Sequence, residues 1–95
     1  MAAYVIVEIA ISDPEVYAEY RQLVPPTVVA YAGAFLGRGG RSKSLEGDWA
    51  PQRIVVIQFP TLERAKAWWS SPEYSQAKVL RQRSAHTRML VVEGV

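Results

Sequence analysis

Apolar residues occur along this chain either as short β-branched runs or as stripes at helical spacing, and the two patterns alternate. The runs at residues 4–11, 53–59 and 88–92 predict strands, because they are rich in Val and Ile and too short for helices. Residues 34–38 are the fourth expected strand. It ends at paired glycines, which are typical of a bulge or of a close backbone approach.

The first helix is predicted to start at Asp13-Pro14-Glu15, where Asp can cap free amides and Pro fits the first turn. Apolar residues then follow at helical spacing: Val16, Tyr17, Tyr20, Leu23 and Val24. Pro25-Pro26 should end or kink this helix, because proline has no N–H to donate and clashes with the preceding turn. A second helical piece is expected over residues 27–32, ending at Gly33.

A further helical region follows the strand at 53–59, with Thr61 as its cap. Its apolar positions are Leu62, Ala65, Trp68 and Trp69. Ser71-Pro72-Glu73 repeats the cap-proline-acid pattern, so a new helix should begin there and continue to about Arg83. The inward-facing residues of that helix are expected to be Tyr74, Ala77 and Leu80.

The order strand, helix, strand, strand, helix, strand predicts an α+β fold. It is the ferredoxin-like βαββαβ sandwich with an antiparallel sheet, as a single domain over residues 1–95. Such connections place the helices on one face of the sheet, yet the strands are apolar at both parities. Each apolar side chain left in water forgoes about 1.5 kcal/mol. We therefore expect a homodimer whose two sheets pack face to face.

Composition narrows the class of protein. Hydrophobic residues make up 49% of the 95 residues and charged residues 21%, which is ordinary for a globular chain. No run approaches the length of a membrane helix and no signal peptide is evident, so a cytoplasmic protein without a membrane partner is expected. The net charge of +2 comes from scattered arginines, and the 53–59 strand offers aliphatic side chains instead of stacking aromatics. No nucleic-acid partner is expected.

Several kinds of site are excluded or disfavoured. The chain has no Cys and one His, so a disulfide, a thiolate nucleophile and a multi-histidine metal site within one protomer are excluded. A carboxylate site across a dimer stays open. Neither a phosphate-binding glycine loop nor a Ser-His-acid signature is present. We expect neither a cofactor nor a metal.

Five segments together carry a family resemblance. They are Arg38-Gly39-Gly40, Leu45-Glu46-Gly47, residues 53–60, residues 68–74 and the final Val92-Glu93-Gly94-Val95. In this combination, over nearly the whole chain, the sequence resembles the family called domain of unknown function 1330. The resemblance implies a dimeric α/β-barrel, in which two ferredoxin-like protomers pair their sheets. Relatives in that superfamily include small monooxygenases, isomerases and dehalogenating or decarboxylating enzymes, so a small-molecule ligand between sheet and helices is implied.

Arg38, with Gly39 and Gly40 after it, is the first candidate for ligand binding and catalysis. Its guanidinium group could clamp a carboxylate in bidentate fashion, with free backbone amides assisting. The alternative is a structural arginine at a bulge that pairs with Glu46 or Asp48.

Aromatic residues are the next candidates. Trp68, Trp69 and Tyr74 surround the expected helix break, and Tyr20 lies on the first helix. They could form an aromatic wall for a small ligand, with packing in the core or a dimer interface as the alternative. Adjacent tryptophans on a helix are displaced by about 100°, so both cannot be plain core.

Histidine changes its charge near neutral pH, which makes His86 the candidate for acid–base catalysis. It is expected in the turn before the last strand, where a solvated loop histidine is the alternative. Glu8 interrupts an apolar strand. We expect a structural ion pair inside the dimer, and Arg53 or Gln58 of the neighbouring strand can be the partner if register and face agree. The alternative is a buried carboxylate that serves as a general base.

Two functions remain in view. The first is a cofactor-independent enzyme acting on a small organic acid or carbonyl compound. In it Arg38 stabilises developing negative charge, Tyr74 and the tryptophans hold the substrate, and His86 or a carboxylate moves a proton. The second is a non-catalytic module that binds a small molecule or regulates another protein. They differ in whether an ionisable group faces the cleft within reach of the ligand.

Overall fold

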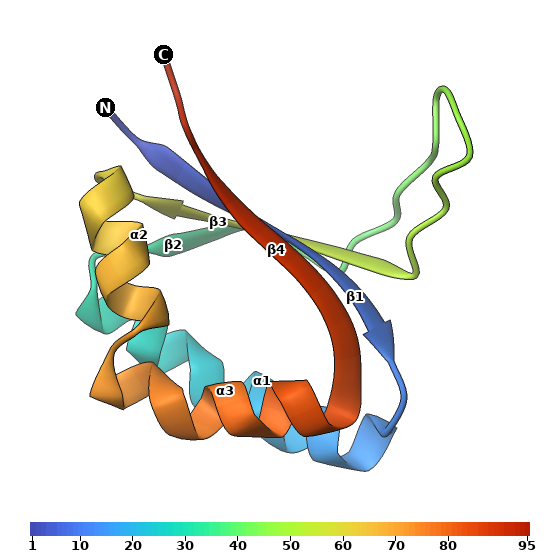
Figure 1. Cartoon of the computed structure of the whole chain (residues 1–95), viewed down its shortest axis with the longest axis horizontal. Coiled ribbons are helices and arrows are strands. Elements are labelled where there is room, and N and C mark those ends of the chain that lie inside the picture. Colours follow the sequence, from blue (N-terminus) through green and yellow to red (C-terminus); the bar gives the residue numbers. More distant parts are fainter.

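The computed structural model describes residues 1–95 as an antiparallel sheet with three helices on one face (Figure 1). In chain order the elements are β1 (Ala3–Ile11), α1 (Pro14–Ala30), β2 (Ala34–Arg38), β3 (Arg53–Phe59), α2 (Leu62–Trp69), α3 (Pro72–Ser84) and β4 (Ala85–Glu93). The strands lie in the order β2-β3-β1-β4, so β2 and β4 are the two edges. This is the ferredoxin-like α+β fold that the sequence predicts.

Side-chain caps begin all three helices at the predicted residues, Asp13, Thr61 and Ser71. In each cap the side-chain oxygen accepts a hydrogen bond from the backbone N–H three residues further on. These donors are Val16, Arg64 and Tyr74, at 3.3, 3.0 and 3.1 Å. The caps satisfy amides that the helix itself leaves free, which explains why α2 ends and α3 begins within a few residues.

Of the two outcomes expected at Pro25-Pro26, an end or a kink of the first helix, the end is wrong. Helix α1 passes through both prolines, and the expected second helical piece is its last part. Pro25 has no N–H to give to the carbonyl of Arg21, four residues earlier. The Nη2 of Arg38 donates to that carbonyl at 2.7 Å instead. A side chain from β2 therefore replaces the hydrogen bond that the proline removes.

The last strand is longer than predicted. It begins at Ala85, directly after α3, and not near Arg88. His86 consequently lies within β4, paired in register with Ala10, and the turn in which it was expected does not exist. The carbonyl of Ser84 accepts hydrogen bonds from the backbone N–H groups of Ser12 and Asp13, which ties this junction to the end of β1.

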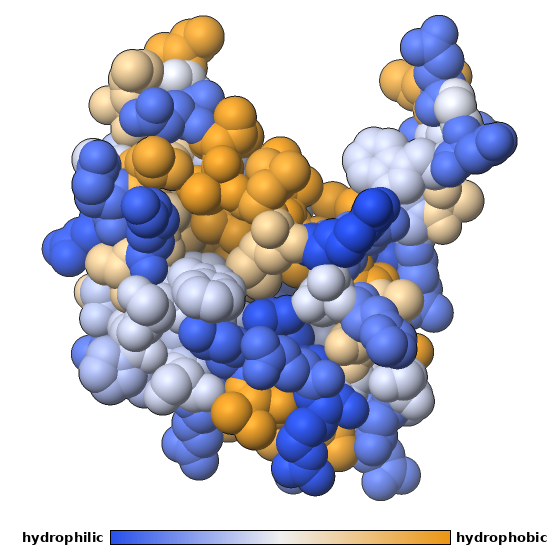
Figure 2. Space-filling view, viewed as in Figure 1, coloured by the Kyte–Doolittle hydropathy of each residue, from blue (hydrophilic) through white to orange (hydrophobic).

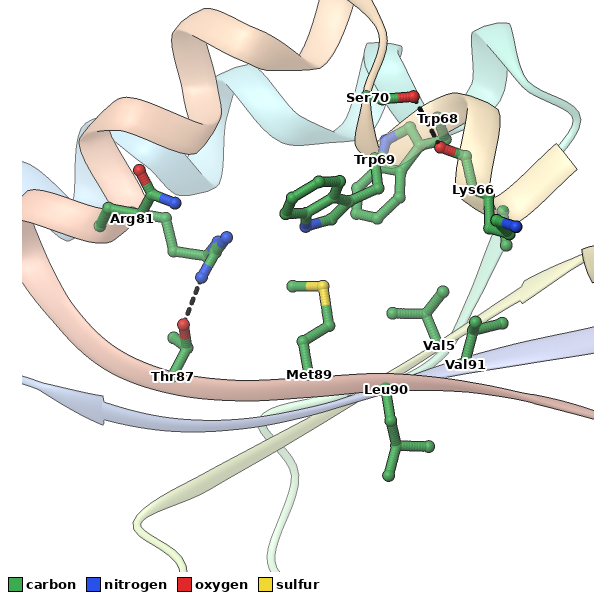
Figure 3. A pocket seen from close by; sticks show the side chains of 12 residues that line it. Val5, Lys66, Trp68, Trp69, Ser70, Arg81, Thr87, Met89, Leu90 and Val91 are labelled. Carbon is green, nitrogen blue, oxygen red and sulfur yellow. Dashed lines mark hydrogen bonds between the residues drawn. The ribbon is translucent and has the colours of Figure 1, made fainter. Parts of the chain in front are cut away.

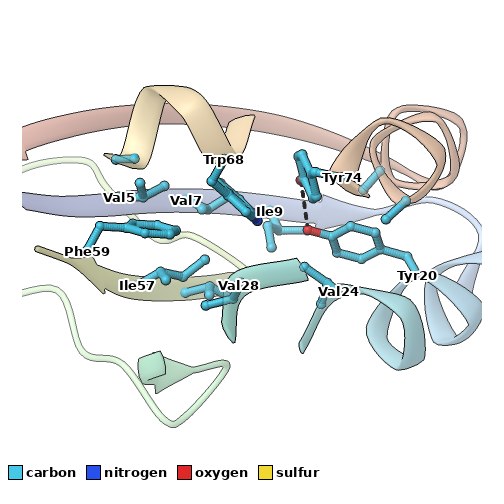
Figure 4. Packing of buried hydrophobic residues seen from close by; sticks show 14 of the residues in the cluster. Val5, Val7, Ile9, Tyr20, Val24, Val28, Ile57, Phe59, Trp68 and Tyr74 are labelled. Carbon is cyan, nitrogen blue, oxygen red and sulfur yellow. Dashed lines mark hydrogen bonds between the residues drawn. The ribbon is translucent and has the colours of Figure 1, made fainter. Parts of the chain in front are cut away.

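The core lies between the sheet and the helices (Figure 4). One parity of each inner strand points into it, and Trp68 and Tyr74 from the helices are fully buried against these strands. The strand residues buried there are Val5, Val7, Ile9, Val55, Ile57 and Phe59. The rings of Trp68 and Tyr74 pack 4.2 Å apart between centroids. Burial of such large side chains supplies most of the stabilisation that a chain of this size can collect.

The opposite face of the sheet has no helix over it, as the parity of the strands predicts. Leu90 and Val92 of β4 are 58% and 46% exposed there, and Ile6 and Val56 of the inner strands are half-buried. We call this the open face. Figure 2 shows a broad hydrophobic surface in the same view as Figure 1. The sheet has two apolar faces, and the helices cover only one of them. The open face is the surface that a second copy of the chain would protect from water.

Glu8 lies on the open face, but its partners differ from those expected. Its Oε1 forms an ion pair with Nη2 of Arg88 at 2.6 Å, and its Oε2 accepts a hydrogen bond from Trp49 Nε1 at 3.2 Å. The hydrogen bond from Arg88 is the main cause that lowers the pKa of Glu8. Arg53 was expected as a partner, but its register opposite Ile9 turns it toward the helices.

Gln58, the other expected partner of Glu8, is paired with Tyr4, near the far end of the strand. The register of the strands therefore decides the partner of Glu8, and the sequence pattern did not fix that register.

Replacing Trp68 with Ala should lower the free energy of unfolding by about 3–5 kcal/mol, because it empties a fully buried site in the core. The matched control is Trp69→Ala at the next residue, where the side chain is 45% exposed. We expect that control to cost about 1 kcal/mol or less. Denaturant unfolding followed by circular dichroism measures both. Equal losses for the two variants would contradict the packing described here.

Candidate functional site

A cavity of about 770 Å³ lies between α2, α3 and the edge strand β4 (Figure 3). This volume falls within the range of small-molecule sites. Its apolar wall consists of Val5, Ala65, Trp68, Trp69, Met89 and Val91. The exposed residues Lys66, Ser70 and Gln82 mark its mouth. We call it the β4-side cavity.

The break between α2 and α3 shapes this cavity. Trp69 is the last residue of α2, and its ring extends over the space above Met89 (Figure 3). Nζ of Lys78 stands 3.6 Å from the centroid of the same ring, on α3. Trp68 turns toward the core instead, where its Nε1 donates to Thr27 Oγ1 at 3.0 Å. The two tryptophans therefore face different surroundings, as their helical spacing predicts.

Arg81 supplies a positive charge to this mainly apolar cavity. The residue is only 4% exposed, and it reaches from α3 toward β4. Its Nε donates to the hydroxyl of Tyr74 at 3.1 Å, and its Nη1 donates to Thr87 Oγ1. No carboxylate forms an ion pair with Arg81. The one ion pair of the molecule joins Arg88 and Glu8. A buried charge without a counter-ion is costly, so an anion that reached this guanidinium group would be stabilised by it.

Tyr74 and Tyr20 stand behind Arg81 and do not line the cavity. Their hydroxyls lie 3.1 Å apart (Figure 4), and the Tyr74 hydroxyl accepts the hydrogen bond from Arg81. Burial is the main cause that raises the pKa of Tyr20 far above its ordinary value, so its phenol stays neutral. The two tyrosines thus hold the guanidinium group in position, whereas the sequence suggested that they contact the ligand.

Arg38 lies elsewhere, at the end of β2. Its guanidinium group stacks 4.6 Å from the centroid of the Phe35 ring and donates to the carbonyl of Arg21. It pairs with neither Glu46 nor Asp48, so these expected partners were wrong, although Arg38 does hold structural contacts next to a bulge in β2. Gly39 follows with a φ of 73°, and nothing lies within 4 Å of the position that a Cβ of Gly40 would take.

His86 lies on the open face. The residue after it, Thr87, faces the β4-side cavity, so the strand itself separates His86 from Arg81. His86 is exposed and borders a shallow hollow together with Glu8 and Arg88. Within one protomer, the three groups of candidates around Arg38, His86 and the tryptophans therefore occupy three separate places.

The ionisable side chains that line the β4-side cavity are Lys66 and Arg81; it has no carboxylate and no imidazole. No cluster of three or more His, Cys, Asp or Glu residues that could hold a metal ion occurs in the molecule. None of the three helices combines the length and the apolar character needed to cross a bilayer. The cavity can therefore bind and stabilise negative charge, but it offers no side chain suited to proton transfer near neutral pH.

Sequence reasoning missed Arg81. The sequence assigned the inward positions of α3 to Tyr74, Ala77 and Leu80. Tyr74 and Ala77 are buried and Leu80 is half-buried against the core, but the neighbour of Leu80 is buried as well. Arg81 continues the inward stripe of Tyr74 and Ala77, at spacings of seven and four residues. A basic residue on the buried stripe of a helix is the signal that could have identified it.

Comparison with solved structures supports the fold. A protein of unknown function from Rhodopseudomonas palustris is similar over 99% of this chain and 82% of its own, with a TM-score of 0.80 and 16% identity. A dimeric ferredoxin-like protein of unknown function from Jannaschia sp. is similar over 99% of this chain and 100% of its own, with a TM-score of 0.76 and 13% identity.

SnoaB, a cofactor-independent oxygenase from Streptomyces nogalater, is similar over 99% of this chain and 93% of its own, with a TM-score of 0.57 and 9% identity. Identities this low relate these proteins to the chain by fold alone. No curated protein matches the sequence. A family model described as "Domain of unknown function (DUF1330)" matches residues 2–95, and the chain belongs to that family.

Proposed function

We propose that the protein binds a small organic acid with an apolar body in the β4-side cavity, where Arg81 holds the negatively charged group. The observation that carries this proposal is the buried guanidinium group of Arg81, which has no carboxylate partner and borders a cavity of about 770 Å³. A bound carboxylate would supply the missing counter-charge. In a water-poor site such a charge-assisted hydrogen bond is about twice as strong as a neutral one.

The walls of the cavity favour a ligand with an apolar body. Trp69 and Met89 face one another across the space, and both can contact a flat or aliphatic group (Figure 3). Lys78 adds a second positive charge beside Trp69. Burial, and then the charge of Arg81, lower the pKa of this lysine.

The chemistry of the lining also bears on catalysis. With no carboxylate or imidazole in the cavity, an enzyme working there would act by stabilising negative charge on a carbonyl or enolate oxygen through Arg81. SnoaB, the cofactor-independent oxygenase among the structural neighbours, supports an enzymatic function only through its similar fold. The lack of a group for proton transfer favours the non-catalytic binding module over an enzyme that uses His86.

We further propose that the protein is a homodimer paired through the open face. A two-fold axis would bring Leu90 and Val92 of both copies into one interface, together with the Glu8–Arg88 pair. The dimeric state of the Jannaschia neighbour is consistent with such a pairing. The β4-side cavity lies on the helix side of the sheet, so pairing through the open face leaves that side of the sheet free.

Binding can be tested by isothermal titration calorimetry with 1-naphthoate and its neutral analogue 1-naphthamide. The wild-type protein should bind the carboxylate at least about tenfold more tightly than the amide, because a hydrogen bond between the Arg81 guanidinium group and a carboxylate joins two charged groups. Arg81→Met should abolish this preference while leaving the amide affinity nearly unchanged.

The matched control for this test is Arg83→Met, which removes the same charge from an exposed position of α3. It should preserve the preference for the carboxylate, and circular dichroism would verify that both variants fold. The binding proposal fails if wild-type protein binds the two naphthalenes equally, or if Arg83→Met weakens carboxylate binding as much as Arg81→Met.

The homodimer can be tested with Leu90→Asp. Two desolvated carboxylates at a symmetric apolar interface should convert the dimer to a monomer at micromolar concentration, as measured by multi-angle light scattering. Val79→Asp is the control, because Val79 is 52% exposed on α3, away from the open face, and this variant should stay dimeric. A wild-type protein of monomeric mass would overturn the proposal.

A further inference from the structure

We propose that Arg21, Arg38 and Arg53 form a second anion-binding site, separate from the β4-side cavity, that takes a phosphoryl group. The three residues come from α1, β2 and β3, and we call them the arginine cluster. Arg81 lies at the β4 edge of the sheet, whereas the arginine cluster lies toward the β2 edge. Trp68 and Met89 border both places, but the arginines that would hold an anion are different ones, so the arginine cluster does not need Arg81.

The arginine cluster gathers three positive charges without a counter-ion. No carboxylate forms an ion pair with any of the three, since the one ion pair of the molecule is on the open face. Arg38 and Arg53 are half-buried, so water screens their repulsion less than it does on the surface. Burial first, and then the charges of Arg21 and Arg53, lower the pKa of Arg38. A dianion would relieve this repulsion better than a monoanion.

The guanidinium groups are held in place but retain unused donors. Arg38 is fixed by the Phe35 ring and by the carbonyl of Arg21. Arg53 lies 5.7 Å from the centroid of the Tyr17 ring, and its Nε is buried without a hydrogen-bond partner. Unpartnered buried donors are rare in folded proteins, and they call for a ligand or a water molecule.

Gly39 explains how Arg53 fits. With φ at 73°, its backbone lies so close to Arg53 that a Cβ there would overlap Nη1 of the guanidinium group. The N–H of Gly39 donates to the carbonyl of Ile54 at 2.9 Å, so this amide is not free for an anion. The glycine therefore makes room for Arg53. The Gly39 amide therefore cannot assist Arg38 in the way that the sequence suggested.

The size of the opening limits the ligand. A narrow cleft of about 20 Å³ lies beside the arginine cluster, bordered by Tyr17, Tyr20 and Phe35. This is room for about one water-sized group. A phosphoryl group would insert one oxygen there and leave the rest of the molecule outside, where exposed Arg21 can reach it. Free phosphate and the terminal group of a phosphate ester share this chemistry.

Calorimetric titration of the full chain with inorganic phosphate, phenyl phosphate and acetate tests the proposal. Both phosphates should bind at least about tenfold more tightly than acetate. Tighter binding of the ester would identify an organic phosphate as the ligand, and equal binding would identify the phosphoryl group alone as sufficient. In ¹H–¹⁵N spectra, phosphate should shift the Nε–Hε signal of Arg53 and leave that of Arg81 in place.

Arg53→Met and Arg38→Met should each weaken phosphate binding at least about tenfold. If Arg53→Met does not fold, Arg53→Lys keeps the charge but loses the fork of donors, and it should still weaken binding. Arg41→Met is the matched control, because Arg41 is an exposed arginine in the segment that joins β2 to β3, and it should change phosphate affinity little.

Cross-testing separates this site from the proposed function. Arg53→Met should bind 1-naphthoate normally, and Arg81→Met should bind phosphate normally. The proposal is overturned if phosphate does not bind, if it shifts the Arg81 signal instead of the Arg53 signal, or if Arg41→Met weakens binding as much as Arg53→Met.

Discussion

All three helices pack on one face of a sheet whose side chains are apolar on both faces, and most other features depend on this arrangement. On the covered face, Trp68 and Tyr74 fill the centre of the layer against β1 and β3. Toward β4 the cover changes, because α2 stops at Trp69 and α3 begins at Pro72. The cap at Ser71 therefore does more than start a helix: it leaves a cavity above the edge strand. The same one-sided cover leaves Leu90 and Val92 in water on the other side.

Charge is distributed unevenly over these two faces. The open face holds the one ion pair, between Arg88 and Glu8, in a region that a partner copy would desolvate. The covered face holds arginines with no carboxylate: Arg81 at one end, and Arg38 with Arg53 at the other. Buried or half-buried cations are stable only when other groups hold them, and here hydroxyls, carbonyls and aromatic rings do so. Such groups orient a cation without neutralising it, which leaves its charge available to a ligand.

Local signals in the sequence predicted the elements well. The caps at Asp13, Thr61 and Ser71 act through atoms three residues away, so their chemistry can be derived from neighbouring residues. The path of α1 through Pro25 could not be derived that way, because the group that replaces the lost hydrogen bond belongs to Arg38, 17 residues from the carbonyl it serves. Likewise Glu8 pairs with Arg88, 80 residues away, through a strand register that no local pattern fixes. Among the candidate residues, the tryptophans and Arg38 could be identified by residue type. Arg81 could not, because it lies on a helical stripe that was expected to be apolar.

The direct passage from α3 into β4 constrains how the chain can change in length. Ser84 ends the helix and Ala85 begins the strand, and the Ser84 carbonyl is bound by the backbone of Ser12 and Asp13. Successive strand residues face opposite sides of a sheet, so one inserted residue at this corner would send Thr87 and Met89 to the wrong side and bring His86 under the helices. Insertions and deletions should accumulate instead in residues 40–48, a stretch with no helix or strand that lies between Gly39, which makes room for Arg53, and Trp49, which binds Glu8.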